Sequence, residues 1–238
     1  IRAGAEAVLK DALDSLEGYT GPVQSVVETG DAAGVLVELS KNAEVLAVGS
    51  RGRGGFIGRL LGSVSSALPA HAKCPTVVVP IEYAKHITER TDPEGKELGP
   101  VVVGVDGSNQ GRLAALRAAE SAVQRGTNLI VVSALPPLGG AVAWLPTMVD
   151  EEAISKDLQE KLDAGKNWLK SYFPELEISS KLGTRGRGGF TGMLLGSTSQ
   201  GVLSYAQGPV MVVPDGPDPR LETRTEFGPV LDETKDIE

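Results

Sequence analysis

The sequence predicts an α/β protein made of two doubly wound, parallel-sheet units, and three observations predict it. Segments with the helical spacing of apolar residues alternate with short Val-rich runs, as expected when helices connect parallel strands. Aromatic residues are only 4% of the 238 residues, so the core must use Val, Leu, Ile and Ala, which suits buried parallel strands. One glycine-rich stretch occurs twice, at residues 49–63 and 183–197, at a constant offset of 134.

In the first half the predicted order is helix, strand, helix, strand, glycine loop, helix and strand. Apolar residues at i, i+3 and i+4 predict the first helix, which Gly18 and Gly21-Pro22 end. Gly30-Asp31 is expected to cap the second helix. The predicted elements are a helix at 3–18, a strand at 23–28, a helix at 32–41, a strand at 44–48, a helix at 63–71 and a strand at 76–79.

The second half opens with Val101-Val-Val-Gly-Val-Asp106-Gly-Ser108, which indicates a buried strand that ends in an aspartate and a turn. A Pro/Gly-rich loop at 136–146 interrupts the alternation once. The later elements are predicted as a helix at 109–125, a strand at 129–134, a helix at 150–170, a strand at 176–179, a helix at 198–205 and a strand at 210–213.

The repeat predicts the domain boundaries. The first domain covers residues 1–80 without an opening strand, helix and strand; 81–99 is a polar linker; the second domain covers 100–214; and 215–238 is a loosely packed acidic tail. Placing Leu9 and Leu16 over Leu162 and Leu169 gives an offset of 153, against 134 for the glycine loops. The second half is therefore short between Ser180 and Leu182, and we expect a chain break near 181/182.

Charge and cysteine usage narrow the function classes. The formal net charge of −8 argues against nucleic acid as the main partner, because phosphate backbones call for a basic face. No apolar run approaches the length of a membrane span. The single cysteine, Cys74, forms no internal disulfide and fits a reducing cytoplasm, where it is best interpreted as a small buried residue.

Both glycine loops have the pattern G-x2-G-x9-G-[ST] and follow an apolar strand. At the carboxyl end of a parallel strand, such a loop presents free N–H groups of the next helix to an anion, and glycines let the backbone come close to phosphate oxygens. Ser63 and Ser197 stand where a hydroxyl caps a helix or binds phosphate. The loops also carry positive charge, at Arg51, Arg53, Arg185 and Arg187. The sequence thus predicts two phosphate-binding loops rather than two plain connections.

Two commoner phosphate motifs are absent. No G-x4-G-K-[ST] occurs, so no Walker-type lysine is available. Ile57 and Thr191 take the last glycine position of a G-x-G-x-x-G pattern. Kinase and dinucleotide-oxidoreductase functions therefore lose their main support.

Three features resemble the universal stress protein family in its tandem-domain form. They are Val103-Gly-Val-Asp-Gly-Ser108, the loop endings Leu-Leu-Gly-Ser63 and Leu-Leu-Gly-Ser197, and the closing runs Cys74-Pro-Thr-Val-Val-Val-Pro80 and Gly208-Pro-Val-Met-Val-Val-Pro214. The resemblance implies a Rossmann-like fold with five parallel strands per domain. It also implies the ATP-binding subgroup, which has this glycine pattern.

The resemblance further implies a set of ATP-binding residues. Asp106 and Gly104 would meet the ribose or adenine end, and Ser133 and Ala134 would offer backbone groups to adenine. The phosphates would lie in the second loop, against Gly183, Gly186, Arg187, Gly188, Gly196, Ser197 and Thr198, and in the first loop against Gly49, Gly52, Arg53, Gly54, Gly62, Ser63 and Val64. The first loop has no equivalent of Asp106 in this sequence. A divalent ion such as Mg²⁺ or Mn²⁺ would bridge the phosphates.

Catalysis has little support, since His71 and His86 are not repeated and no Ser-His-Asp set or metal-ligand cluster is visible. The leading hypothesis is a cytoplasmic, ATP-binding regulator of the stress response. The alternatives are a slow ATPase or phosphotransfer enzyme and a nucleotide-independent dimeric scaffold; cyclic AMP stays open as the adenine ligand. The last strands, 76–79 and 210–213, are expected to pair the halves into a pseudo-dimer within the chain, or to form a homodimer.

Overall fold

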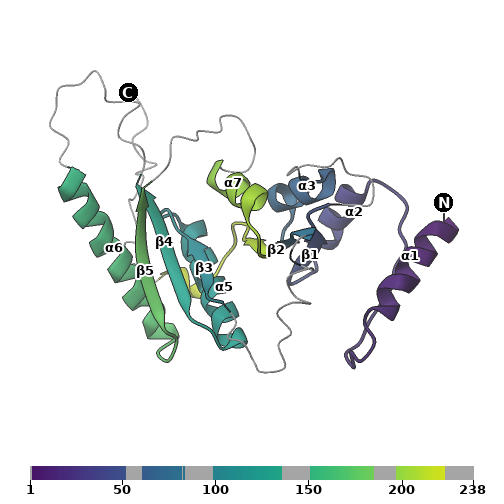
Figure 1. Cartoon of the computed structure of the whole chain (residues 1–238), viewed down its shortest axis with the longest axis horizontal. Coiled ribbons are helices and arrows are strands. Elements are labelled where there is room, and N and C mark those ends of the chain that lie inside the picture. The colour runs from purple at the N-terminus through teal and green to yellow at the C-terminus, as the bar shows by residue number, and fades with distance from the viewer. Residues whose placement is uncertain are drawn as a thin grey trace, which may run out of the picture.

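The computed structural model describes residues 2–51, 61–81, 83, 99–135, 151–184 and 197–222. These residues form two three-stranded sheets with helices packed beside them (Figure 1). The helices are α1 (Arg2–Asp14), α2 (Ala32–Leu39), α3 (Ser63–His71), α5 (Asn109–Arg125), α6 (Glu151–Tyr172), α7 (Ser197–Tyr205) and the short η1 (Pro219–Glu222). The strands are β1 (Leu46–Gly49), β2 (Thr76–Val79), β3 (Val101–Gly104), β4 (Leu129–Leu135), β5 (Ile178–Thr184) and β6 (Val210–Val212).

The second half contains a parallel sheet in the order β3-β4-β5. Every other strand residue faces the helices, so Val103 in β3 and Val131 in β4 are buried, whereas Val102 is 60% exposed. Leu116 of α5 and Leu162 of α6 are fully buried and belong to the same core cluster as those valines. The parallel α/β class predicted from the sequence is therefore confirmed.

The arrangement differs from the prediction in two respects. Each described sheet has three strands rather than five. In addition, α5 and α6 pack on the same face of β3-β4-β5, because both contribute to one core cluster and contact each other. The reason is the direction of the crossovers. Two successive right-handed connections that step the same way along a sheet put their helices on one face. The described part of this half is thus wound on one face only.

β5 passes through residues 181 and 182 without interruption, and the chain break expected near 181/182 stays a prediction. Lys181 pairs with Val132 and Leu182 with Ser133, so the ladder to β4 continues to Thr184. A single long strand therefore replaces the short strand predicted at 176–179. No crossover is needed, since the strand that leaves α6 is also the one that enters the glycine loop.

A polar cluster holds β5 against α6. The Ser180 hydroxyl donates a hydrogen bond to Asp163 Oδ1 at 3.0 Å, and Lys166 Nζ lies 2.9 Å from the same oxygen. The hydrogen bond from Lys166 is the largest of the contacts that lower the pKa of Asp163, followed by that from Gln159. Ser180 thus faces the helices without leaving its hydroxyl unpaired.

The first half has a smaller core around β1 and β2, which are parallel. Leu46 of β1, Leu68 of α3 and Cys74 are buried together, and Leu36 of α2 packs against them. Burial raises the pKa of the Cys74 thiol, in keeping with the structural role predicted for it. Asp31 caps α2 as predicted, since its Oδ2 accepts a hydrogen bond from Gly34 N at 2.8 Å.

The strand predicted at 23–28 is wrong. These residues have no regular secondary structure, and Val23 and Val26 are 50% and 54% exposed. A strand needs a neighbour to satisfy its N–H and C=O groups, and no described strand pairs with this segment. Helix α1 also stands apart from the sheets (Figure 1), and its Val8 and Leu13 are 44% and 39% exposed.

The last strands pair the two halves within one chain, as predicted. β6 runs antiparallel to β2, with Val77 opposite Met211 and Val78 opposite Val210. The sheet of the first half is therefore completed by a strand of the second half, in the order β1-β2-β6.

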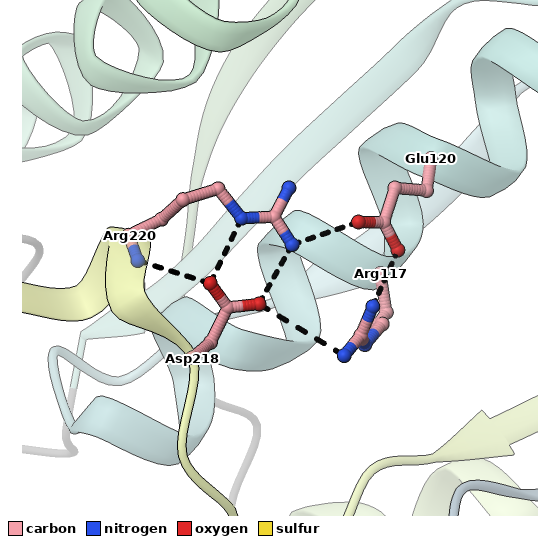
Figure 2. Close-up of polar contacts among 4 residues, drawn as sticks. All are labelled: Arg117, Glu120, Asp218 and Arg220. Carbon is pink, nitrogen blue, oxygen red and sulfur yellow. Dashed lines mark hydrogen bonds and ion pairs between the residues drawn. The ribbon is translucent and has the colours of Figure 1, made fainter. Parts of the chain in front are cut away.

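The beginning of the predicted loose tail is anchored instead to α5 (Figure 2). Asp218 accepts hydrogen bonds from Arg220 Nε at 2.9 Å and Nη2 at 2.7 Å, and its side chain is only 7% exposed. Arg220 also reaches Glu120 Oε1 at 2.8 Å, and Arg117 bonds the other oxygen of Glu120 at 2.9 Å. This four-residue ion-pair cluster fixes residues 218–220, whereas 223–238 lie outside the described residues.

Candidate functional site

The carboxyl ends of three neighbouring strands bring several predicted site residues to one edge of the sheet. Gly104 of β3 is level with Val132 of β4, and Ala134 of β4 is level with Gly183 of β5. The register places Asp106, two residues beyond Gly104, at the level of Ala134 and Gly183. Since neighbouring strands are about 4.8 Å apart, Asp106 and Gly183 lie roughly 10 Å from each other on either side of β4. The predicted adenine and phosphate ends of the site thus share one edge.

Asp106 forms the turn between β3 and α5. Its Oδ1 accepts hydrogen bonds from Ser108 N at 3.1 Å and Ser108 Oγ at 2.6 Å, and the Ser108 hydroxyl accepts from Gly111 N at 3.0 Å. A Cβ at Gly111 would lie 2.8 Å from Asp106 Oδ1, so a side chain there would displace that carboxylate from the turn. Asp106 is exposed, and its Oδ2 has no hydrogen bond with the described residues. The carboxylate therefore shapes the turn through Oδ1.

Between Asp106 and Gly183 lies the end of β4. Ser133 is 3% exposed and faces the core, whereas the next residue, Ala134, is exposed. A Cβ at Gly183 would lie 3.7 Å from the Ser133 carbonyl oxygen. The Ser133 hydroxyl faces the core, away from the exposed edge residue Ala134, and the backbone contact of these residues with adenine stays a prediction.

The first glycine loop is closed at its base. The chain leaves β1 at Gly49 and returns at Gly62, whose N–H donates a 2.9 Å hydrogen bond to the Ser50 carbonyl. The Ser65 hydroxyl donates to the same carbonyl at 2.8 Å. Ser50 N in turn donates to Val79 O at 2.8 Å, which joins the base of the loop to β2.

The start of α3 excludes one of the two roles expected for Ser63, that of a helix cap, and leaves phosphate binding as a prediction. Gly62 is the N-cap of this helix, with no side-chain capping bond, and Ser63 is the first helical residue. The Ser63 hydroxyl therefore does not cap the helix, but it is exposed and beside the free N–H groups of the first turn. Val64 is half-buried and packs into the core, so only its backbone N–H is available to a ligand.

The described residues do not themselves require glycine at the four described glycines of the predicted site. A Cβ would meet nothing closer than 3.5 Å at Gly49 and Gly62, nothing closer than 3.7 Å at Gly183, and nothing within 4 Å at Gly104. Gly18, Gly30, Gly107 and Gly126 are the described glycines with positive φ, so none of the four site glycines needs that freedom.

The remaining predicted residues are outside this description or only partly within it. Ser197 and Thr198 are the first residues of α7, which starts as the repeat predicts. The rest of the predicted phosphate loop residues lie outside the described residues: Gly52, Arg53, Gly54, Gly186, Arg187, Gly188 and Gly196.

The described residues contain no cluster of three or more His, Cys, Asp or Glu side chains that could hold a metal ion. Likewise, no described helix has both the length and the apolar character needed to cross a membrane.

Reasoning from sequence missed Ser50 and Ser65, which close the first loop. A signal for Ser65 was present, because Ser199 occupies the same position of the second repeat.

The fold and these positions define a two-part α/β protein with matched glycine loops that follow the carboxyl ends of its strands. The family model of the universal stress protein family matches residues 2–80 and 182–214. The chain is 32% identical over 236 residues to a universal stress protein of Mycolicibacterium smegmatis, covering 88% of this chain and 74% of that protein. It is 33% identical over 243 residues to one of Mycobacterium tuberculosis, covering 91% of this chain and 73% of that protein.

The same relationship is seen in three dimensions. The structure of a universal stress protein from Archaeoglobus fulgidus superposes with a TM-score of 0.61 at 21% identity, covering 90% of this chain and 79% of that one. This likeness supports the fold alone. The sequence relatives show that the chain belongs to the universal stress protein family, whose members take part in stress responses.

Proposed function

We propose that this protein binds the adenine nucleotide ATP and acts as a nucleotide-dependent regulator in the stress response. The observation that carries the proposal is the set of four site glycines that the protein does not itself require. Gly49, Gly62, Gly104 and Gly183 have no positive φ, and a Cβ at each would come no closer than 3.5 Å to the described residues. Close approach of a ligand to the backbone is a physical reason for glycine at such positions.

The start of α3 supports the phosphate end of the proposal. The described helices α2 and α5 have side-chain caps, from Asp31 and Ser108, whereas α3 begins at an uncapped glycine after the loop. Its first-turn N–H groups and the positive end of its dipole are thus available to an anion. Arg51 and Arg53 add positive charge in the same loop.

The edge formed by β3, β4 and β5 supports a nucleotide lying across β4. Asp106 Oδ2 is suited to accept hydrogen bonds from ribose hydroxyls, and the backbone at Ser133 and Ala134 offers groups to adenine. The separation of roughly 10 Å between Asp106 and Gly183 leaves room for a ribose and phosphates between them. The second loop would hold the phosphates through Gly183, Gly186, Arg187, Gly188, Gly196, Ser197 and Thr198.

The residues of the chain would bind and orient the nucleotide rather than transform it. A bridging Mg²⁺ or Mn²⁺, if bound, would neutralise phosphate charge and be held by the phosphates themselves. None of the described site residues is a histidine or lysine suited to act as a general base, so we propose regulation through nucleotide occupancy in the cytoplasm, with no catalytic role. Assembly into a homodimer is part of the same proposal.

Alanine substitutions at the site glycines test this proposal. Gly62→Ala, Gly104→Ala and Gly183→Ala are expected to keep the unfolding midpoint of the parent, because each Cβ has room, while they weaken ATP binding measured by calorimetry. Gly201→Ala is the matched control, since a Cβ there also meets nothing within 4 Å and the residue is outside the proposed site. Unchanged ATP affinity in all three site variants would contradict the proposed site.

The same calorimetric titration separates the alternatives. Cyclic AMP binding tighter than ATP would change the ligand but keep the site. ATP turnover above a protein-free control would favour the slow ATPase or phosphotransfer enzyme. Absence of binding by any adenine nucleotide, together with a stable dimer, would favour the nucleotide-independent scaffold.

A further inference from the structure

We propose that Ser65 is a positioning residue: its buried hydroxyl closes the base of the first glycine loop and thereby fixes where the first turn of α3 presents its N–H groups. The inference rests on the proposed nucleotide binding and adds to it a residue that the glycine pattern does not include.

The contacts of Ser65 reach across the loop. Its side chain is 2% exposed, and its hydroxyl lies 2.8 Å from the Ser50 carbonyl oxygen and 3.1 Å from that of Gly62. The longer contact is local, within one helical turn. The shorter contact joins residues fifteen positions apart, on opposite ends of the loop. The hydroxyl therefore links the exit from β1 to the entry into α3.

The carbonyl of Ser50 is the anchor of this closure. It accepts hydrogen bonds from both Gly62 N and the Ser65 hydroxyl, while Ser50 N is bonded to Val79 O at 2.8 Å. The start of α3 is thus fixed relative to the sheet by two hydrogen bonds to one oxygen. Removing the Ser65 hydroxyl would leave Gly62 N as the remaining donor to Ser50 O that the described residues provide.

The neighbouring Ser66 shows that this is not a general property of serines in the first turn. Its hydroxyl bonds only local carbonyls, those of Gly62 at 2.9 Å and Ser63 at 3.0 Å. Such bonds back to the preceding turn are common for helical serines and do not cross the loop. Ser66 therefore serves as a matched control for Ser65.

The repeat extends the inference to the second loop. At the constant offset of 134, Ser199 occupies the position of Ser65 and Thr184 that of Ser50. Ser199 is half-buried in the first turn of α7, and Thr184 is the last residue of β5. The same closure is expected there.

The test compares three single substitutions in the full chain. Ser65→Ala removes the proposed closure, and Ser66→Ala removes a local hydroxyl of the same turn. Ser40→Ala removes another buried hydroxyl of the first half. The Ser40 hydroxyl accepts a 2.9 Å hydrogen bond from Lys73 N, and neither residue belongs to the loop. The measurements are ATP affinity by calorimetry, the unfolding midpoint, and hydrogen exchange at the Gly62 amide without nucleotide.

Ser65→Ala is expected to weaken ATP binding at the first loop by roughly threefold to tenfold, the effect of one hydrogen bond. It should also accelerate exchange at the Gly62 amide. Ser40→Ala should lower the unfolding midpoint but change neither ATP affinity nor exchange at the Gly62 amide. Ser66→Ala should leave ATP affinity, the unfolding midpoint and Gly62 exchange near the parent values. A purely structural role would instead make Ser65→Ala resemble Ser40→Ala, and that result would overturn the inference.

Two outcomes separate this inference from the proposed function. If the parent protein binds ATP and Ser65→Ala binds it equally well, the positioning role is wrong and the proposed function stands. If the parent binds no adenine nucleotide, the proposed function fails. Hydrogen exchange at the Gly62 amide still tests whether the Ser65 hydroxyl closes the base of the loop, and unchanged exchange in Ser65→Ala would overturn that role as well.

Discussion

At the scale of single residues, Thr76 combines burial with an unsatisfied hydroxyl. Its side chain is 1% exposed, and its Oγ1 has no hydrogen-bond partner among the described residues. Thr76 is the first residue of β2 and lies opposite Val212 of β6. The hydroxyl therefore loses its hydration on folding without a bond in return, which is unfavourable.

We expect Thr76→Val to raise the free energy of unfolding by about 1 kcal/mol, because valine has the same shape without the buried hydroxyl. Urea denaturation monitored by circular dichroism measures it. Thr127→Val is the control, since the Thr127 hydroxyl is hydrogen-bonded to Gly99 O at 3.2 Å, and its loss should not stabilise the protein. A destabilised Thr76→Val variant would mean that its hydroxyl has a partner in the folded protein.

Asp218 gives the clearest expected pH dependence. Hydrogen bonds from Arg220 hold the pKa of Asp218 at about 2, below its ordinary value of 3.8. A pKa that is lower in the folded state means stability that is complete above the unfolded pKa and is lost as the pH falls through the folded one. This carboxylate therefore stabilises the protein above about pH 5 and ceases to do so near pH 2.

Asp218→Asn is expected to lower the free energy of unfolding by about 2 kcal/mol at pH 7, because the ionised partner of Arg220 is lost. The difference from the parent should shrink as the pH falls below 4. Unfolding curves at pH 7, 5 and 3 measure it. Glu175→Gln, at an exposed acid on the surface, is the control for a general change of charge. An equal difference at pH 7 and pH 3 would contradict the role assigned to Asp218.

At the scale of elements, the β2–β6 ladder joins the two halves of the chain. The last strands are short and rich in valine, and each would otherwise leave an open edge. Val77 faces Met211 across the ladder, and Met211 is 43% exposed, so this pair lies on an accessible face.

A disulfide between these positions tests the pairing. Opposite residues of antiparallel strands have Cα atoms about 4.5–5.5 Å apart, within the range of a disulfide. In a Cys74→Ala background, Val77→Cys with Met211→Cys should form an intrachain disulfide on mild oxidation, seen as a shift on non-reducing gels. Val77→Cys with Val210→Cys is the control, because these side chains point to opposite faces. A cross-linked dimer instead of a monomer would show that the strands pair between copies.

Sequence patterns predicted most elements because their signals are local. The Asp31 and Ser108 caps lie at the helix starts that the pattern indicates, and the Val-rich runs form strands where expected. The prediction of a strand at 23–28 was wrong because an apolar run forms a strand only beside a partner strand. The sequence of the run does not show whether such a partner is present. The length of β5 was underestimated for a related reason, since the short apolar run at 176–179 does not show how far the strand extends its ladder with β4.

The candidate site was predictable to the extent that it follows strand ends. Gly104, Asp106, Ala134 and Gly183 were implied by the resemblance to the universal stress protein family, and the register brings them to one edge of the sheet. What the pattern could not supply was the closure by Ser50 and Ser65, because it depends on a carbonyl and a hydroxyl from distant positions.

At the scale of the whole molecule, the two glycine loops follow strands of two different sheets. The halves are linked because β6 pairs with β2. The first loop follows β1 in the sheet β1-β2-β6, and the second follows β5 in the sheet β3-β4-β5 (Figure 1). Since β6 belongs to the second half by sequence and to the first sheet by pairing, the two halves of the chain are joined through a β-ladder.

The most direct test of the account is the stability of the full chain with and without MgATP. A ligand that binds only the folded protein raises the free energy of unfolding by about 2.7 kcal/mol at a hundredfold excess over its Kd. The account predicts an increase in the unfolding midpoint that grows with MgATP concentration and is lost in a Gly62→Ala, Gly183→Ala double variant. An unchanged midpoint in the parent at saturating MgATP, or the same increase in the double variant, would contradict it.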